Sequence, residues 1–131
     1  MLLWREWAVP MYTVRACIGF SAAHRIHGHP RCGRLHGHNY RVCVELREEK
    51  PMDIDLDELD EWLRKNVYEL MDHHYLNQRL APMLGGGEEV DTVTAEDMAR
   101  LIAGWLEEKW PGRVVRVEVC ETSDLCASYQ P

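Results

Sequence analysis

The sequence contains no uninterrupted apolar stretch near the roughly 20 residues that a membrane-spanning helix requires, so no membrane partner is expected. A secretory signal is also missing, because residues 1–7 already include Arg5 and Glu6 and no cleavage pattern follows them. These two absences predict a cytoplasmic protein. We interpret residues 1–10 as an N-terminal extension, or as the result of a start placed upstream of Met11.

The five cysteines include no Cys-x-x-Cys pair, and without a secretory context we expect no disulfide framework. Cys17 and Cys43 are interpreted as small packing residues on strands. Cys32 differs, because it lies between Arg31 and Arg34, whose positive charges favour the thiolate form. We therefore expect Cys32 to be a base or a nucleophile, and a role as a fourth metal ligand is the alternative.

Acidic residues are absent from residues 22–44, although the whole chain has a formal net charge of −7. The overall charge excludes a general nucleic-acid surface, which needs a basic stripe that displaces counterions. The charged side chains of residues 22–44 are four arginines, Arg25, Arg31, Arg34 and Arg41. Their field would favour a phosphorylated or otherwise anionic substrate, and scattered solvent-facing arginines are the alternative interpretation.

Three histidines lie on two segments that alternate like strands. Even-numbered residues of segment 12–24 form one apolar face that ends at His24, and segment 36–46 begins with His36 and His38 on its own apolar face. An antiparallel hairpin would bring the three imidazoles together at one end of a sheet. Three imidazoles with an open fourth position are typical of catalytic Zn²⁺, which binds nitrogen at roughly 2.0–2.1 Å. Two further histidines, in the connecting loop, are expected to be exposed rather than ligands: His27 and His29.

Apolar residues at helical spacing predict two amphipathic helices, over residues 56–71 and 94–110. Thr94 is the predicted N-cap of the second helix, and Asp97 is its partner in a capping box. The residues around both helices contain no phosphate-binding loop, because the glycines at 85–87 lack the Gly-Lys-Ser/Thr ending.

Two more strands are predicted after the second helix. Residues 115–121 alternate, with valines at 115, 117 and 119, and a short strand follows at residues 126–129. The 131 residues then form one domain of the α+β class, with both helices on one face of a four-stranded antiparallel sheet. Glu121 continues the valine face, so its carboxylate should pair with a cation or receive a ligand with two adjacent N–H donors, such as a pterin-like ring.

At the end of the first predicted helix, Asp72 directly precedes His73. A carboxylate beside an imidazole can orient the ring and stabilise its protonated form. The alternative is an ordinary polar helix end, because adjacent residues do not automatically face each other.

Six motifs together resemble the family of 6-pyruvoyltetrahydropterin synthase and 6-carboxytetrahydropterin synthase, over about residues 12–129. The motifs are Phe20-Ser-Ala-Ala-His24, Cys32-Gly-Arg-Leu-His36-Gly-His38, Asp53-Ile-Asp55, Leu70-Met-Asp72-His73-His74-Tyr-Leu-Asn77, Thr94-Ala-Glu96 and Cys120-Glu121-Thr122. The resemblance implies a tunnelling fold (T-fold) of order ββααββ. Sheets of several subunits would join into a barrel, commonly a hexamer of two stacked trimers, with active sites between subunits.

The resemblance also implies roles for individual residues. The implied zinc ligands are His24, His36 and His38. The implied catalytic residues are Cys32 as general base, and Asp72, His73 and Glu121 as a proton relay. Substrate-binding roles are predicted for Glu121, which would anchor the pterin ring, Thr94 and Arg34.

Three residues separate Cys32 from His36, which resembles the carboxytetrahydropterin synthases, whereas the pyruvoyl-forming enzymes have a longer interval. The implied reaction is that of a lyase, converting 7,8-dihydroneopterin triphosphate into 6-carboxy-5,6,7,8-tetrahydropterin, acetaldehyde and triphosphate on the route to queuosine or archaeosine. The alternatives are a pyruvoyl-forming synthase, an enzyme cleaving a dihydroneopterin side chain for folate, and a non-catalytic zinc-stabilised assembly module. A zinc hydrolase is disfavoured because no His-Glu-x-x-His helix is present.

Overall fold

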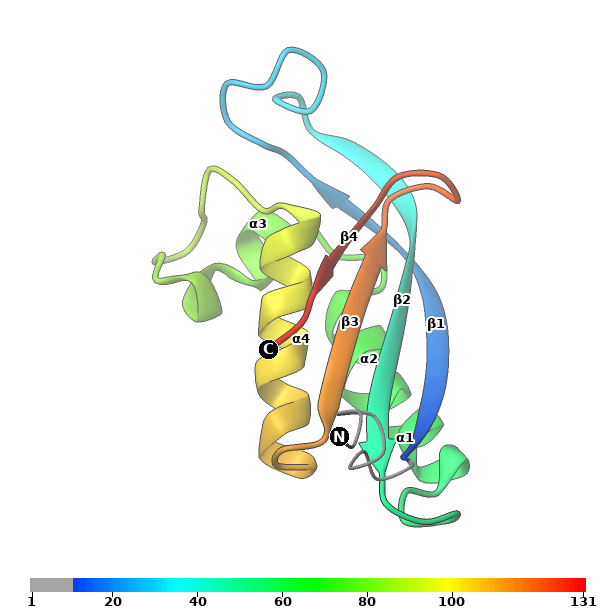
Figure 1. Cartoon of the computed structure of the whole chain (residues 1–131). Helices are drawn as coiled ribbons and strands as arrows, with labels where there is room; N and C mark the ends of the chain where they lie inside the picture. The colour runs from blue at the N-terminus through cyan, green and yellow to red at the C-terminus, as the bar shows by residue number, and fades with distance from the viewer. Residues whose placement is uncertain (1–10) are drawn as a thin grey trace, which may run out of the picture.

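The computed structural model describes residues 11–131 of the chain, so the predicted N-terminal extension lies outside the described residues. Four strands form one antiparallel sheet in the order β1-β2-β3-β4 (Figure 1). The strands are β1 (Tyr12–His24), β2 (His36–Glu48), β3 (Val114–Cys120) and β4 (Cys126–Tyr129). The main helices follow β2 in the chain and cover one face of the sheet (Figure 1). This is the predicted α+β architecture.

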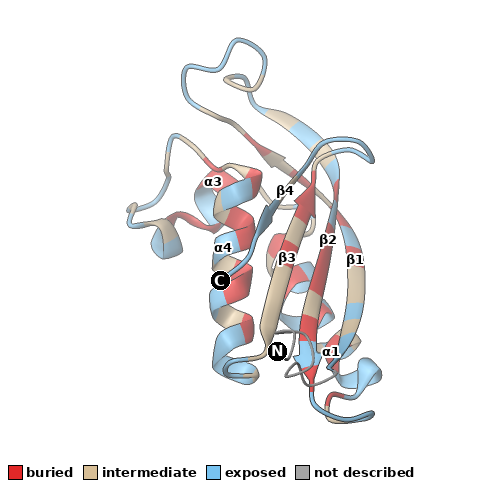
Figure 2. Ribbon diagram, viewed as in Figure 1, coloured by how far each residue is buried: buried red, intermediate tan, exposed pale blue. Residues whose placement is uncertain are grey.

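The hairpin of β1 and β2 has the register that the sequence predicts. It pairs Tyr12 with Glu48 at one end and His24 with His36 at the other. Side chains alternate between the two faces of a strand, so a shift of one residue would turn the whole apolar face towards solvent. Most even-numbered residues of both strands instead face the core beneath the helices, among them Ile18, Phe20, Val42 and Val44, whereas Tyr12 at the start of β1 is half exposed. Figure 2 colours the buried residues of the sheet and helices red.

The first predicted helix, over residues 56–71, is present as a continuous run with a π-helical middle. It consists of α1 (Leu56–Leu63), the π-helical segment Arg64–Tyr68 and α2 (Glu69–Met71). Its four fully buried residues recur every four positions: Leu59, Leu63, Val67 and Met71. On a regular α-helix each step of four residues drifts by about 40° around the axis. The wider π-helical turn counters this drift, so the stripe stays on the core.

The second predicted helix is α4 (Ala95–Lys109), and its predicted capping box is confirmed. The Thr94 hydroxyl accepts a hydrogen bond from the Asp97 N–H, and the Asp97 carboxylate accepts one from the Thr94 N–H, both at 3.0 Å. Two short turns that were not predicted lie between the main helices, α3 (Leu76–Arg79) and the 3-10 turn Ala81–Leu84.

The third strand departs from the predicted alternation at its start. A register shift between Glu45 and Leu46 places Val114 opposite Leu46. Val114 packs against the core in place of Val115, while Val117 and Val119 are fully buried as expected. A β-bulge inserts one unpaired residue, and the parity of a strand therefore changes where the bulge occurs.

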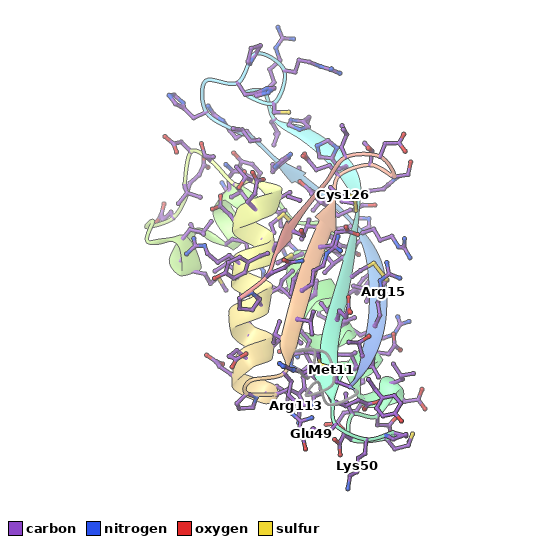
Figure 3. All side chains as sticks on the ribbon, viewed as in Figure 1. Met11, Arg15, Glu49, Lys50, Arg113 and Cys126 are labelled. Carbon is purple, nitrogen blue, oxygen red and sulfur yellow. A yellow bond between two sulfur atoms is a disulfide. The ribbon has the colours of Figure 1, made fainter. Side chains whose placement is uncertain are left out.

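The expectation that the cysteines form no disulfides is wrong for four of the five. Cys17 bonds to Cys43 across β1 and β2, and Cys120 bonds to Cys126 across β3 and β4, as the sulfur bonds of Figure 3 show. The strand register sets each pair directly opposite, with Cα atoms 4.0 Å apart. Cysteine spacing along the chain does not reveal these pairs, because the partners meet across neighbouring strands.

Charged side chains gather at the end of the sheet opposite the three histidines. Glu49, Lys50 and Arg113 lie together there (Figure 3). Asp53 joins them, since its carboxylate accepts from the backbone N–H groups of Glu49 and Lys50 and lies 3.6 Å from Arg113. Among residues 11–131, no helix is long and apolar enough to cross a membrane.

The capping box allows a test of how α4 begins. Replacing Thr94 by Ala removes the acceptor for the Asp97 N–H, so the free energy of unfolding should fall by about 1 kcal/mol. Thr94→Ser keeps a hydroxyl and should stay close to wild type. Urea unfolding followed by circular dichroism measures both variants, and equal losses for Ala and Ser would contradict the capping role.

Candidate metal centre and active site

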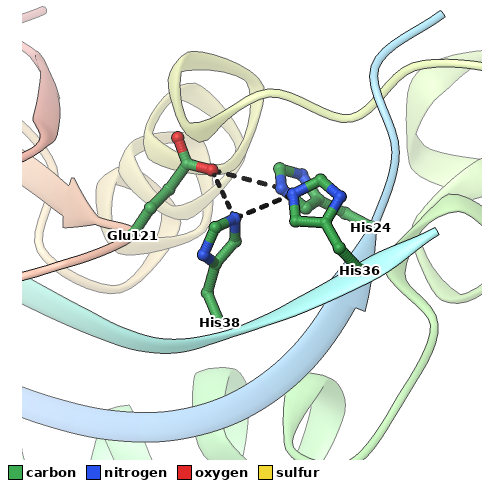
Figure 4. A group of neighbouring side chains, drawn as sticks. All are labelled: His24, His36, His38 and Glu121. Atoms are coloured by element: carbon green, nitrogen blue, oxygen red, sulfur yellow. Dashed lines mark hydrogen bonds and ion pairs between the residues drawn. The ribbon is translucent and has the colours of Figure 1, made fainter. Parts of the chain in front are cut away.

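The hairpin places the three histidines side by side at one end of the sheet (Figure 4). His24 is the last residue of β1, and His36 and His38 lie at the start of β2. The ring centroids are 4.6 to 5.0 Å apart in all three pairs. The predicted convergence of the imidazoles is therefore present in the structure.

Backbone carbonyl groups orient two of the three rings. His24 Nδ1 donates to the Val93 carbonyl oxygen at 2.7 Å, and His36 Nδ1 donates to the Arg34 carbonyl oxygen at 2.6 Å. A carbonyl accepts only, so each Nδ1 carries the proton and each Nε2 of a neutral ring keeps its lone pair. Such a fixed tautomer is characteristic of metal-binding histidines.

Glu121 completes the group. It directly follows β3, and its Oε2 lies 2.9 Å from His38 Nε2 and 3.2 Å from His24 Nε2 (Figure 4). The sequence predicted a cation or a ligand for this carboxylate, and the structure places it against the imidazoles.

The donor set fits a zinc ion. The ligand atoms of His24, His36, His38 and Glu121 all lie within 4.8 Å of one another. His24 Nε2 is buried and forms no hydrogen bond within the described residues, although the Glu121 carboxylate lies 3.2 Å away, and His36 Nε2 and His38 Nε2 are 2.9 Å apart. Two lone pairs at this distance repel unless a proton or a metal ion lies between them. Nitrogen and carboxylate ligands are those that zinc prefers.

Burial favours the neutral form of two of the imidazoles. Burial lowers the pKa of His24 and of His38 below the usual imidazole value, against the opposing effect of the Glu121 carboxylate. Neutral imidazole is the form that binds metal, because a protonated ring has no free lone pair.

A buried asparagine anchors the backbone around His24, and the sequence reasoning assigned it no role. Asn77 is fully buried, and its side chain binds both the N–H and the carbonyl of Arg25, at 2.9 and 3.1 Å. It also donates to the Val90 carbonyl at 3.0 Å. Asn77 therefore joins the end of β1 to the segment that leads to Val93, whose carbonyl orients His24. A buried amide with every partner satisfied is difficult to recognise from sequence, because its partners lie far along the chain.

Asp72 and His73 form the predicted pair. The Asp72 carboxylate accepts from His73 Nδ1 at 2.8 Å and from the Ser21 N–H at 3.0 Å. The Ser21 N–H holds the pKa of the Asp72 carboxyl below its usual value, and His73 adds to this effect. The pair is attached to the open edge of β1, since the His73 N–H donates to the Ser21 carbonyl at 2.6 Å.

The His73 backbone adopts a positive φ of 58°, which is uncommon for a residue with a side chain. Its ring is largely exposed and lines an open hollow of about 480 Å³ together with His38, Asn39 and Tyr75. One hollow therefore connects the predicted proton relay with a predicted metal ligand.

The remaining predicted site residues lie around this centre. Cys32 is the free cysteine of the described chain and lies in the loop between β1 and β2, and its sulfur is outside the four-residue group. Glu121 rather than Cys32 is therefore the fourth member of that group. The backbone carbonyl of Arg34 accepts the hydrogen bond from the candidate metal ligand His36. The Thr94 side chain caps α4, and Thr94 directly follows Val93.

This combination of sheet order, helix placement and hairpin histidines defines a T-fold protein. The chain belongs to the 6-pyruvoyl tetrahydropterin synthase family, whose family model matches residues 13–131.

Relatives with curated names support this assignment. A provisionally named 6-carboxy-5,6,7,8-tetrahydropterin synthase of Archaeoglobus fulgidus is 36% identical over 114 residues, covering 85% of this chain and 89% of that protein. The 6-carboxy-5,6,7,8-tetrahydropterin synthase of Synechocystis is 30% identical over 128 residues, covering 91% and 93%. Among solved structures, the 6-pyruvoyl tetrahydropterin synthase of Caenorhabditis elegans is similar with a TM-score of 0.77 and 25% identity, covering 94% and 97%.

Asn77 offers a test of how the candidate metal centre is held. Asn77→Ala leaves part-buried backbone groups of Arg25 and Val90 without partners, so the free energy of unfolding should fall by about 2–4 kcal/mol. Zinc affinity should fall by about tenfold, because the backbone around His24 is no longer fixed. Urea unfolding and competition with a chromogenic zinc chelator measure the two effects.

The matched control is Asn66→Ala, since Asn66 is exposed and donates one hydrogen bond within its own helix. It should change neither quantity appreciably. Unaltered zinc affinity in a destabilised Asn77→Ala protein would show that Asn77 supports the fold without supporting the metal centre.

Proposed function

We propose that this chain is a zinc-dependent 6-carboxy-5,6,7,8-tetrahydropterin synthase. The proposed reaction converts 7,8-dihydroneopterin triphosphate into 6-carboxytetrahydropterin, acetaldehyde and triphosphate, as a lyase on the route to queuosine or archaeosine. The observation that carries the proposal is the convergence of three histidines, two of which donate from Nδ1 to a carbonyl and so keep Nε2 unprotonated. The choice of product is supported by the short interval between Cys32 and His36 and by the names of the curated relatives.

Zinc held by His24, His36 and His38 would supply Lewis-acid stabilisation to the oxygens of the substrate side chain. In the proposed mechanism, Cys32 takes and returns a proton on carbon. His73, held by Asp72, transfers a proton on the other side of the substrate. The ionised Asp72 favours this role, because it stabilises the charged imidazolium that forms when His73 accepts a proton.

Glu121 is proposed to anchor the pterin ring. A carboxylate can accept both adjacent N–H donors of such a ring, and this holds the reacting atoms in place. The local excess of arginine over acid in residues 22–44 would favour the triphosphate, whose negative charge grows as it leaves.

Homo-oligomerisation, with a hexamer of two stacked trimers and active sites between subunits, is part of the proposal. The sheet of the described chain has two open edges, formed by β4 and by most of β1. Open edges favour pairing with another strand. A cytoplasmic location remains a prediction from the sequence.

A pyruvoyl-forming synthase is the second candidate, favoured by the similarity to the Caenorhabditis elegans structure. The purified, zinc-loaded protein should be incubated with 7,8-dihydroneopterin triphosphate and its products identified by mass spectrometry. We expect carboxytetrahydropterin and acetaldehyde. A pyruvoyl or hydroxymethyl pterin would instead identify a different pathway, and absent turnover with zinc bound would favour an assembly module.

Cys32→Ala should abolish turnover in the same assay while zinc content and oligomer size stay at wild-type levels, because the Cys32 sulfur lies outside the candidate metal group. Inductively coupled plasma mass spectrometry and analytical ultracentrifugation provide these two controls. Loss of zinc from Cys32→Ala would identify Cys32 as a ligand and contradict its role as a base.

Glu121→Gln distinguishes the two roles that its position allows. As a ring anchor, the variant keeps zinc on three histidines and raises KM by about 10- to 100-fold, because it loses charge-assisted hydrogen bonds to the ring. Glu118→Gln is the matched control, since Glu118 lies on β3, which Glu121 directly follows, and pairs with Arg116 at 2.6 Å. Zinc loss from Glu121→Gln, with normal zinc in the control, would make Glu121 a metal ligand.

A further inference from the structure

The loop between β1 and β2 is built around the side chain of His29. His29 Nδ1 accepts hydrogen bonds from the backbone N–H of Arg31 at 3.1 Å and of Cys32 at 2.9 Å. Both bonds need the lone pair of Nδ1, so the ring is neutral and carries its proton on Nε2. The sequence had assigned His29 to an exposed loop with little weight, and the structure gives its side chain two backbone partners.

These bonds cap a single tight turn. The His29 carbonyl accepts from the Gly33 N–H at 3.0 Å, so residues 29–33 form one turn with the imidazole over its start. This is the arrangement in which an N-cap side chain satisfies the first free N–H groups of a helix. Gly33 allows the turn to close, because a Cβ atom at this position would lie 2.6 Å from the His29 carbonyl oxygen.

The backbone of Cys32 is held on both sides. Its N–H donates to His29, and its carbonyl accepts from the Ile26 N–H at 2.6 Å. Ile26 pairs in turn with Thr92, which precedes the Val93 carbonyl that orients His24. Hydrogen bonds therefore connect the backbone of Cys32, through Ile26 and Thr92, to the candidate metal ligand His24. Within the loop between β1 and β2, His29 is the residue that contributes a side chain to this series.

We propose that His29 is the positioning residue of Cys32. The proposal rests on the proposed function, which assigns Cys32 as the proton-transferring base. The side-chain hydrogen bonds of His29 go to the backbone of Arg31 and Cys32, so His29 acts by fixing the backbone from which the thiol projects. A base displaced by about 1 Å can lose a factor of 100 in rate, so a capped turn under the thiol is a requirement of the chemistry rather than of the fold.

The test compares an acceptor with a non-acceptor at position 29. His29→Leu removes the acceptor, whereas His29→Asn keeps a side-chain oxygen that can cap the same turn. The control is His27→Leu, because the His27 side chain forms no hydrogen bond within residues 11–131. Each variant is assayed with 7,8-dihydroneopterin triphosphate, and the zinc-loaded protein is treated with iodoacetamide to measure alkylation of Cys32 by mass spectrometry.

His29→Leu should lower kcat by about 10- to 100-fold with zinc content unchanged. KM should rise less than kcat falls, because Arg31 is the one arginine within residues 29–33 and the proposed ring anchor Glu121 is untouched. Alkylation of Cys32 should accelerate by roughly threefold or more, since the released loop exposes the thiol. His29→Asn should restore most of kcat and the slow alkylation, and His27→Leu should behave as wild type.

Several results would overturn the proposal: wild-type kcat and alkylation in His29→Leu, equal impairment of His29→Asn and His29→Leu, or loss of zinc from His29→Leu. If His29→Leu folds poorly, His29→Ala enters the same comparison. If the wild-type protein does not convert the pterin triphosphate, the proposed function fails, and the alkylation rates of the Leu and Asn variants still decide whether His29 positions Cys32.

Discussion

The register of the β1–β2 hairpin is the constraint on which the rest of the structure depends. It sets His24 opposite His36, places Cys17 opposite Cys43 and turns the even-numbered side chains towards the helices. A slip by one residue would remove the metal group, the disulfide and the apolar face at once, because all three rely on the same alternation. A large buried face therefore stabilises the geometry of a small polar site.

The site also depends on contacts between segments distant in the chain. The Val93 carbonyl fixes the tautomer of His24, and Asn77 joins the backbone at Arg25 to Val90. At the edge of β1, the Ser21 N–H donates a hydrogen bond to the Asp72 carboxylate. Each contact connects β1 to the chain between the main helices, so this region has a role in holding the site as well as in covering the core.

Local sequence patterns predicted the elements well where one periodicity dominates. Both long strands, the capped start of α4 and the short last strand lie close to where alternation and capping place them. The pattern was insufficient where the geometry is irregular. In the first helix, buried residues spaced four apart are kept on one face by a π-helical turn at residues 64–68. In β3, a bulge places Val114 instead of Val115 on the core face.

The sequence by itself determined the two apolar faces, the three histidines at the end of one of them and the Asp72–His73 pair. Alternation and adjacency are local properties, and they can be recognised without coordinates. Only the tertiary structure decided which cysteines bond, which carbonyl groups orient the imidazoles, and that His29 caps the turn beneath Cys32. These outcomes depend on the distances between residues that different elements bring together, and on backbone groups that every residue carries and that no sequence pattern distinguishes.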